Sequence, residues 1–401
     1  MGDMAVNHTL VLRFADVGAA TYASLRVVGD PARTVVWVVA PQAVNSARAE
    51  LTDALPEPVG AEDQRHALDR AFTRGGFARP ATESAIAERL GAQLIDPEAW
   101  RLLLDTVSSP RAALFVSPST RLAQVPWGLL AAPDDSGARL MELCDIYLAT
   151  PANIAHAARP GAGWSRRRDA AALLLLDPKV PGQRPDSPLG SVLGRPDPDG
   201  PLTRHFAGRA TATLPEVGDP VELFRRADVD RGWLFAQLAR DPSRLLYVGH
   251  ATAADGDDGR ADRAALHLAE PQPFAAMDLM ASRAPTPPRV ALLACSSGGD
   301  YRFDEASGLV AAMILGGAEL VTATLWSLPT TAGHRQYGPA PDADPMADLI
   351  IGVDDAHDAD HAGRAVNRWQ RAAMRRWRDG DLTASPLYWA SLATFAVGGA
   401  R

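Results

Sequence analysis

Residues 244–250 read Arg-Leu-Leu-Tyr-Val-Gly-His, and residues 289–298 read Arg-Val-Ala-Leu-Leu-Ala-Cys-Ser-Ser-Gly. Each run is short, rich in aliphatic residues and followed by small residues, which is typical of a buried parallel strand. His250 and Cys295 stand where the two strands would end. Because the carboxyl ends of neighbouring strands in an open α/β sheet face a common crevice, we expect these side chains to meet there. The two runs predict an α/β fold with a cysteine–histidine nucleophilic site.

The composition indicates a globular protein and argues against two classes of partner. Of the 401 residues, 47% are hydrophobic and 22% are charged, which suits one large core or two ordinary ones. The net charge of −8 does not fit a nucleic-acid-binding surface, which needs an excess of clustered lysine and arginine. The first residues lack the basic and apolar regions of a signal peptide, and no apolar run is long enough to span a bilayer. We therefore expect a cytoplasmic protein that binds neither nucleic acid nor membrane.

The cysteine and histidine residues narrow the candidate chemistry. Two cysteines are too few for a disulfide framework; Cys144 lies in an apolar stretch and is predicted to be buried and structural, which leaves Cys295 as the nucleophile. His357 and His361 have the i, i+4 spacing of a helical metal site, but no glutamate follows the first histidine. The acidic residues around them and the arginines further on fit one solvated helix instead. We predict no metal and no cofactor.

The N-terminal part of the chain predicts a small α+β region. Alternating apolar and polar residues between positions 8 and 40 predict three antiparallel strands, followed by helices over 41–55 and 86–94. No repeat of about 34 residues, as in tetratricopeptide arrays, is present. We predict a separate region over residues 1–95; a sensing, docking or propeptide-like role and plain structural packing remain open.

Later segments carry predictions of their own. We expect a buried strand over 173–176, an edge strand over 264–268 that leaves His267 exposed or capping, and a packed strand over 389–395. The stretch from Asp177 to Pro201 is dense in proline, glycine and aspartate, which predicts a long loop. That loop is either an activation or specificity segment or a surface insertion.

Several stretches together resemble the CHAT peptidases, which are caspase-like cysteine proteases related to separase. The stretches are 124–130 (Gln-Val-Pro-Trp-Gly-Leu-Leu), 246–251 (Leu-Tyr-Val-Gly-His-Ala), 293–298 (Leu-Ala-Cys-Ser-Ser-Gly), 316–318 (Gly-Gly-Ala), 324–326 (Thr-Leu-Trp) and 385–390 (Ser-Pro-Leu-Tyr-Trp-Ala). The resemblance implies a caspase-like three-layer sandwich with a mainly parallel central sheet over residues 96–401, divided into an N-terminal portion (96–170) and a catalytic portion (171–401). It also implies a regulated bacterial protease of defence or cell death, with a protein substrate and a separate activating or regulatory protein.

The chemistry of the predicted dyad assigns a role to each residue. A thiol with an ordinary pKa is only a few per cent ionised at neutral pH, so Cys295 needs a base, and His250 is the candidate. In the related families backbone N–H groups of the nucleophile and of the residue after the histidine bind the oxyanion; here these residues are Cys295 and Ala251. Many relatives have glycine at the second place, but alanine supplies the same N–H unless the backbone requires a positive φ. We predict a cysteine endopeptidase; the alternative is a catalytically silent scaffold or protein-interaction module of the same fold.

The residue that would recognise the substrate side chain before the scissile bond departs from the family pattern. Relatives read approximately W-x-V-x-D after a strand, and the aspartate helps to accept arginine or lysine; here residues 326–330 read Trp-Ser-Leu-Pro-Thr, so Thr330 replaces it. Either another acid supplies the charge, with Asp177, Asp300 and Glu305 as candidates, or the pocket accepts a small or apolar residue. The second alternative is favoured, because a guanidinium buried without a counter-charge is strongly unfavourable.

Overall fold

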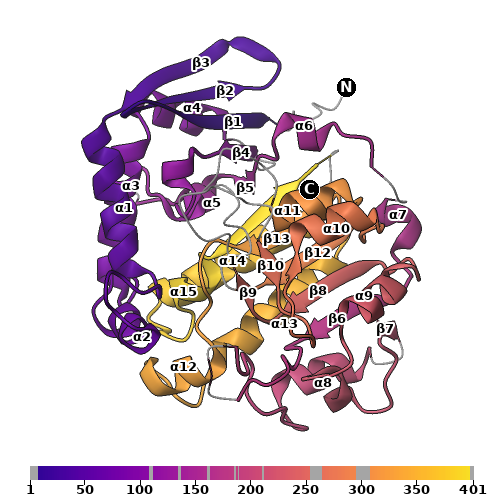
Figure 1. The fold of residues 1–401 in the computed structure, drawn as a ribbon. Coiled ribbons are helices and arrows are strands. Elements are labelled where there is room, and N and C mark those ends of the chain that lie inside the picture. Colours follow the sequence, from indigo (N-terminus) through magenta and orange to yellow (C-terminus); the bar gives the residue numbers. More distant parts are fainter. Residues whose placement is uncertain are drawn as a thin grey trace. The chain divides into compact units, whose positions relative to one another are not determined.

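The structure, a computed structural model of the 401-residue chain, describes residues 8–107, 112–133, 137–159, 163–184, 187, 189–209, 212–252, 264–294 and 308–397. The chain divides into two compact units (Figure 1). The first unit comprises residues 1–149 and 370–390, and the second comprises residues 150–369 and 391–401. The predicted boundary between residues 95 and 96 stays a prediction.

The first unit contains strands in the order β3-β2-β1-β4-β5. β1 (Thr9–Val17), β2 (Ala20–Val27) and β3 (Asp30–Val39) form an antiparallel meander, and β4 (Ala113–Ser117) and β5 (Asp145–Leu148) add parallel strands beside β1. Alternate residues of β1 are buried, as the period of two in a strand with one covered face requires. The three antiparallel strands predicted between residues 8 and 40 are confirmed.

Helices surround this part of the sheet in the first unit. They are α1 (Pro41–Ala54), α2 (Gln64–Thr73), α3 (Pro80–Leu94), α4 (Pro97–Thr106), η1 (Thr120–Leu122), η2 (Trp127–Leu129), α5 (Leu140–Leu143), the end of α14 (Ala362–Arg378) and α15 (Pro386–Trp389). Helices α1, α3 and α4 begin with proline, whose missing N–H has no intrahelical partner at that position. Cys144 is fully buried beside α5, as predicted for a structural cysteine.

The second unit contains strands in the order β14-β13-β12-β8-β6-β7. β6 (Ala172–Leu176), β7 (Thr213–Leu214), β8 (Arg244–Val248), β12 (Arg289–Leu293) and β13 (Leu320–Thr324) are parallel, and β14 (Leu392–Ala396) runs antiparallel to β13. Every residue of β6, β8 and β12 is buried, which explains why these strands read as continuous apolar runs. The predicted α/β class with a mainly parallel sheet is confirmed.

Helices cover both faces of this sheet. They are α6 (Ala152–Ala155), α7 (Trp164–Arg167), α8 (Pro201–Ala207), η4 (Pro220–Leu223), α9 (Arg231–Leu238), α10 (Ala276–Ser282), α11 (Leu309–Leu315), α12 (Thr331–Tyr337), α13 (Pro345–Asp358) and the start of α14. Because β8, β12 and β13 follow one another across the sheet, right-handed crossovers place α10 and α11 together on one face (Figure 1). Helices α8 and α13 pack together over the other face.

Two arginines at the start of neighbouring strands hold α13 in place. Arg244 and Arg289 are paired in register at the first positions of β8 and β12, so their like charges need separate partners. The guanidinium of Arg289 donates to the carbonyl oxygens of His357 (2.7 Å) and Ala359 (2.6 Å), where the end of α13 carries its partial negative charge. It also lies 3.4 Å from the centroid of the Trp164 ring. Burial lowers the pKa of Arg289 to about 10, so it stays charged at neutral pH.

Three local predictions were wrong. His267 is buried, because it follows β10 (Ala265–Leu266), which lies between β9 (Ala251–Thr252) and β11 (Phe274–Ala275) in a second small sheet. The expected single helix through residues 357 and 361 is two helices, α13 and α14. The predicted strand over 389–395 begins only at Leu392, after the short helix α15.

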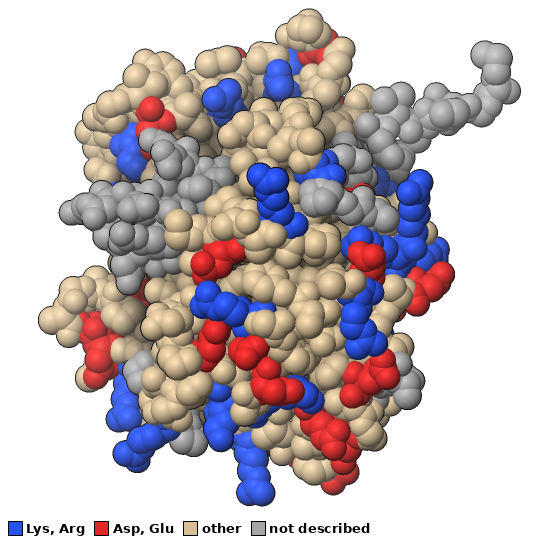
Figure 2. Space-filling model, turned by 45° about the vertical axis from the view of Figure 1, so that its right-hand side comes forward, with Lys and Arg blue, Asp and Glu red and all other residues tan. Residues whose placement is uncertain are grey.

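The surface carries charge of both signs. On the face in Figure 2, basic and acidic side chains are interspersed among the described residues. Within the described ranges, no helix has the length and the apolar character that crossing a membrane requires.

Candidate active site

The ends of β8, β12 and β13 lie side by side in the second unit. The N–H of Gly249 donates to the carbonyl oxygen of Leu293 (3.3 Å), one residue beyond the paired strands β8 and β12. The hydroxyl of Thr324, at the end of β13, donates to the carbonyl oxygen of Ala294. These two hydrogen bonds fix the backbone at Gly249 and at Ala294, the residues that precede His250 and Cys295 in the sequence. Cys295, Asp300 and Glu305 lie outside the described residues.

His250 is buried, with 8% of its surface exposed. Its Nε2 lies 3.1 Å from the carbonyl oxygen of Gly190. Because a carbonyl oxygen only accepts, Nε2 carries the ring proton, and in the neutral ring Nδ1 is then the basic nitrogen. Burial lowers the pKa of His250 below its ordinary value of 6.5, against the opposing effects of the Gly190 hydrogen bond and the charge of Asp177. At neutral pH the imidazole is uncharged and able to accept a proton.

The backbone of His250 is held by a tyrosine on the same strand. The hydroxyl of Tyr247 donates to the carbonyl oxygen of His250 (2.6 Å), and it also lies 2.9 Å from the carbonyl oxygen of His267. A Cβ on residue 249 would lie 2.7 Å from that hydroxyl and 2.9 Å from the ring carbon that bears it. Gly249 is thus required by the close approach of Tyr247. The glycine before the histidine serves packing at the end of the strand.

The backbone orientation of Ala251 is set by its pairing with β10. It pairs with Leu266 in the antiparallel β9–β10 ladder, and the neighbouring His267 N–H donates to the His250 carbonyl oxygen (2.9 Å). In such a ladder the N–H of the intervening residue points away from the partner strand. Ala251 is also absent from the described non-glycine residues with positive φ, so alanine fits here without strain.

Asp177 lies at the end of β6 with none of its surface exposed. Its carboxylate accepts from the hydroxyl of Ser191 and from the backbone N–H groups of Val192 (3.2 Å) and Leu193 (3.4 Å). Nη1 of Arg225 lies 3.3 Å from the same carboxylate. The segment after Gly190 is therefore anchored on Asp177 by three contacts, and Arg225 adds a fourth contact to the same carboxylate.

Thr330 lies on the other side of the same segment. It is the N-cap of α12, where its hydroxyl accepts from the N–H of Gly333 (3.1 Å). The next residue, Thr331, donates its N–H to the carbonyl oxygen of Val192 (3.0 Å). Segment 190–194 thus brings three of the predicted site residues together, since it contacts His250 and Asp177 directly and reaches Thr330 through its neighbour.

Gly190, Ser191 and Arg225 belong to this cluster and were missed by sequence reasoning. Gly190 acts through its carbonyl oxygen, which every residue type has, so no side-chain pattern marks it. Arg225 lies 48 positions from Asp177 in a segment without a motif. A positive φ at Arg225 (54°) and at Asp177 (56°) is a structural signal of constraint, but it is not visible in the sequence.

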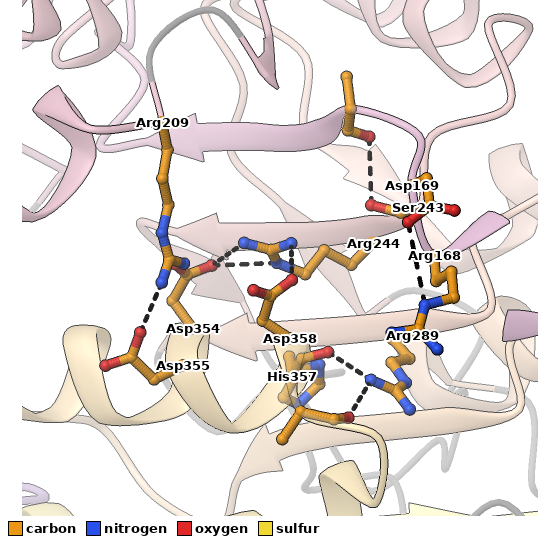
Figure 3. Close-up of polar contacts among 12 residues, drawn as sticks. Arg168, Asp169, Arg209, Ser243, Arg244, Arg289, Asp354, Asp355, His357 and Asp358 are labelled. Carbon is orange, nitrogen blue, oxygen red and sulfur yellow. Dashed lines mark hydrogen bonds and ion pairs between the residues drawn. The ribbon is translucent and has the colours of Figure 1, made fainter. Parts of the chain in front are cut away.

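A second polar cluster lies at the opposite edge of the sheet (Figure 3). Among the described residues, His205, Asp354 and Asp355 are close enough to share a metal ion. Both carboxylates already bind arginine, because Arg209 donates to Asp354 (2.6 Å) and Asp355 (2.8 Å), and Arg244 donates to Asp354 (3.1 Å). Two guanidinium groups stand where a cation would bind, so the cluster is an ion-pair network.

The histidine pair with helical metal spacing is separated by the fold. His357 lies inside α13 and is 1% exposed, with its Nε2 2.8 Å from the hydroxyl of Thr322. Burial lowers the pKa of His357 to about 3, helped by the charges of Arg289 and Arg244. His361 lies beyond the end of α13 and is exposed. The two rings do not share a helix face.

Comparisons with known proteins show the family to which the chain belongs. A CHAT domain family model matches residues 84–398. The complex of the Porphyromonas gingivalis RgpB pro- and mature domains is similar over 77% of this chain and 70% of that chain, with 8% identity and a TM-score of 0.40. Two structures of the Saccharomyces cerevisiae separase–securin complex are similar over 97% of this chain and 30% of that chain, with 12% identity and TM-scores of 0.46 and 0.43. A search of curated protein sequences found no match. Because the family model covers most of the sequence, from α3 to the end of β14, the chain belongs to the CHAT domain family.

Proposed function

We propose that this protein is a cysteine endopeptidase in which Cys295 and His250 hydrolyse peptide bonds of a protein substrate. The observation that carries the proposal is the pairing of two strand ends: β8 and β12 are parallel neighbours in register, Val248 opposite Leu293, and His250 stands two residues beyond that pair. Cys295 also stands two residues beyond it in the sequence, one peptide bond after the fixed Ala294. The resemblance to caspase-like cysteine peptidases supports the same assignment.

The residues present are sufficient for a two-step hydrolysis. Nδ1 of His250 takes the thiol proton of Cys295 while the sulfur attacks the scissile carbonyl carbon, and a tetrahedral oxyanion forms. The C–N bond then breaks, and the imidazolium returns the proton to the leaving amine, which leaves a thioester on Cys295. A water molecule, deprotonated by Nδ1, adds to the thioester. The C–S bond breaks, the acid product leaves, and the sulfur regains its proton from the imidazolium.

Backbone N–H groups of Ala251 and Cys295 are the proposed oxyanion donors. The N–H of Ala251 points away from β10, as described above, so it is not used by the β9–β10 ladder. A preorganised donor of this kind commonly contributes about 10²–10³-fold to the rate. Protein groups supply every step, and the proposal needs no metal or cofactor.

Labelling with an electrophilic peptide tests the proposal directly. A peptidyl chloromethyl ketone is expected to modify Cys295 and to leave the buried Cys144 unmodified in the folded protein. His250→Ala is expected to slow the labelling, because the thiolate loses its base. Mass spectrometry of tryptic peptides locates the adduct, and the urea-unfolded protein, in which both thiols are accessible, is the control. If Cys295 reacts no faster in the folded protein than in the unfolded chain, the protein is a silent scaffold of the same fold.

We further propose that the enzyme prefers a small or apolar residue before the scissile bond. Thr330, whose hydroxyl caps α12, and the buried Leu328 have uncharged side chains, so neither supplies a negative charge. The carboxylate of Asp177 is enclosed by its own contacts. Cleavage of a peptide library is expected to show selection of small or apolar residues. A profile dominated by arginine or lysine would contradict the preference and would direct attention to Asp300 and Glu305.

Regulation by a second protein is also proposed, on the strength of the family resemblance. The isolated chain then has low basal activity that rises when a partner binds or when the chain is cleaved within the loop over 177–201 or within the N-terminal region over residues 1–95. A role in bacterial defence or cell death is proposed on the same resemblance.

A further inference from the structure

We propose that Asp177, Ser191 and Arg225 form an orienting clamp for the catalytic histidine: they fix segment 190–194 so that the carbonyl oxygen of Gly190 holds the imidazole of His250. The inference rests on the proposed function, since His250 is taken as the base. It assigns these three residues as positioning residues, which act through Gly190 and touch neither the substrate nor the reacting atoms.

The first half of the clamp is the carboxylate of Asp177. One oxygen accepts from the Val192 N–H and from Arg225, and the other accepts from the Ser191 hydroxyl and the Leu193 N–H. Two carboxylate oxygens offer about four acceptor positions, so all of them are in use. A fully buried carboxylate with no free acceptor does not bind a substrate guanidinium. Its partners show that its role is to hold the turn that follows Gly190.

The second half is the guanidinium of Arg225. Its Nη1 lies 3.3 Å from Asp177 and 3.1 Å from the carbonyl oxygen of Gly190, the same atom that accepts from His250. Its backbone N–H donates to the carbonyl oxygen of Leu176 (3.0 Å), which fixes Arg225 beside the end of β6. The Gly190 oxygen therefore receives one donor from the clamp and one from the histidine.

Backbone conformation supports a constrained role. Among the described residues, four non-glycine residues have a positive φ, and Asp177 and Arg225 are two of them. This region of backbone conformation is unfavourable for an ordinary side chain and persists where surrounding contacts determine it. Here those contacts are the ones that join Asp177 and Arg225 to each other and to Gly190.

The clamp carries one charge of each sign, and this provides a distinctive readout. The titratable groups that act on His250 in the described structure are Asp177, Arg225 and His267, which come from the end of β6, the segment after η4 and the segment after β10. The negative charge of Asp177 raises the pKa of His250, and the positive charge of Arg225 lowers it. Removing one charge therefore moves this pKa in the direction opposite to removing the other. Opposite shifts show that both charges act on His250, and the ring tautomer measured below separates a positioning role from an effect of charge alone.

The test compares Asp177→Asn, Arg225→Met and Arg225→Lys in the full chain. The acid limb of the pH profile of kcat/KM, which requires neutral His250, is expected to move to lower pH in Asp177→Asn and to higher pH in Arg225→Met. Both variants are expected to lose rate at the pH optimum by up to about 10²-fold, because a displacement of the catalytic base by about 1 Å lowers the rate by that factor. Arg225→Lys keeps the charge, so its acid limb is expected to stay near the wild-type position. Arg226→Met is the matched control, because the Arg226 side chain pairs with the exposed Asp228 (2.9 Å) and should leave the profile unchanged.

A second measurement separates the clamp from the proposed function. ¹⁵N NMR of histidine-labelled protein reports which ring nitrogen of His250 is protonated, whether or not the protein cleaves peptides. The Nε2–H form is expected in the wild type and in Arg226→Met, and a mixture of the two neutral forms in Arg225→Met. Wild-type activity with unchanged pH profiles and tautomer in both charge variants would overturn the clamp alone. An inactive wild type with an unreactive Cys295 would overturn the proposed function, and the tautomer would still decide the clamp. If Asp177→Asn does not fold, Ser191→Ala replaces it in the tautomer measurement.

Discussion

Replacing Cys295 with alanine is expected to abolish peptide-bond hydrolysis, and replacing His250 with alanine is expected to lower kcat/KM by about 10²–10⁴-fold. The first change removes the atom that forms the thioester. The second removes the proposed base, whose Nε2 donates to the carbonyl oxygen of Gly190. Initial rates on a fluorogenic peptide, measured with enzyme concentrations varied over several decades, check both values.

Cys144→Ser is the matched control for these variants. Cys144 is fully buried in the first unit, where its Sγ donates to the carbonyl oxygen of Leu140 (3.5 Å), so serine should keep the contact and the activity. Circular dichroism and thermal unfolding confirm that each variant is folded. Equal hydrolysis by wild type and Cys295→Ala would contradict the enzyme hypothesis. Loss of activity in Cys144→Ser alone would show that the Cys144 thiol, and not that of Cys295, is needed for hydrolysis.

The sequence predicted the parts of the site that depend on strand patterning. Fully buried parallel strands must be apolar throughout, so β6, β8 and β12 are visible as runs, and the residues at their ends could be assigned to one edge. Helix α1 and the antiparallel strands of the first unit were visible through a different signal, the periodic spacing of their apolar residues. These are local signals, each contained in fewer than twenty residues.

The contacts that orient the site could not be predicted, because they join distant segments through backbone atoms. Gly190 binds His250 across 60 positions with a carbonyl oxygen, and no residue type is required there. Asp177 was named from the sequence only as a candidate acid of the substrate pocket, and its partners in the structure lie in a loop whose path no periodicity describes. Likewise, the burial of His267 depends on β9 and β11, which are two residues long and too short to leave a pattern.

The amino ends and the carboxyl ends of β8 and β12 make different contacts. At the amino ends of β8 and β12, Arg244 and Arg289 bind α13 and fasten it to the sheet. At the carboxyl ends, Gly249 and Tyr247 hold the backbone of His250. The first set stabilises the sheet whose strand ends carry the second set.

Asp354→Asn is expected to lower the free energy of unfolding by about 3–5 kcal/mol, the usual effect of breaking a buried ion pair from one side. Asp354 is 1% exposed and accepts from Arg244 (Figure 3), and it also accepts from Arg209 and His205, so the amide leaves two guanidinium groups without their shared counter-charge. Urea unfolding of the two proteins at neutral pH, followed by circular dichroism, measures the difference. Asp355→Asn is the control: this neighbour pairs with Arg209 at the surface, where an ion pair contributes about 1 kcal/mol or less.

The pH dependence of stability provides an independent check on Asp354. Burial alone would raise the pKa of Asp354, but the hydrogen bond to His205 and the charges of Arg244 and Arg209 outweigh burial and hold it below its ordinary value of 3.8. The unfolded state therefore binds this proton more readily than the folded state, and stability rises with pH in the interval between the two pKa values. The contribution is fully present above the unfolded value and is lost as the pH falls through the folded one. Asp354→Asn has no such proton to bind, so below pH 4 its stability should fall less steeply than that of the wild type, and parallel curves would show that the carboxylate is not held in its charged form by the two arginines.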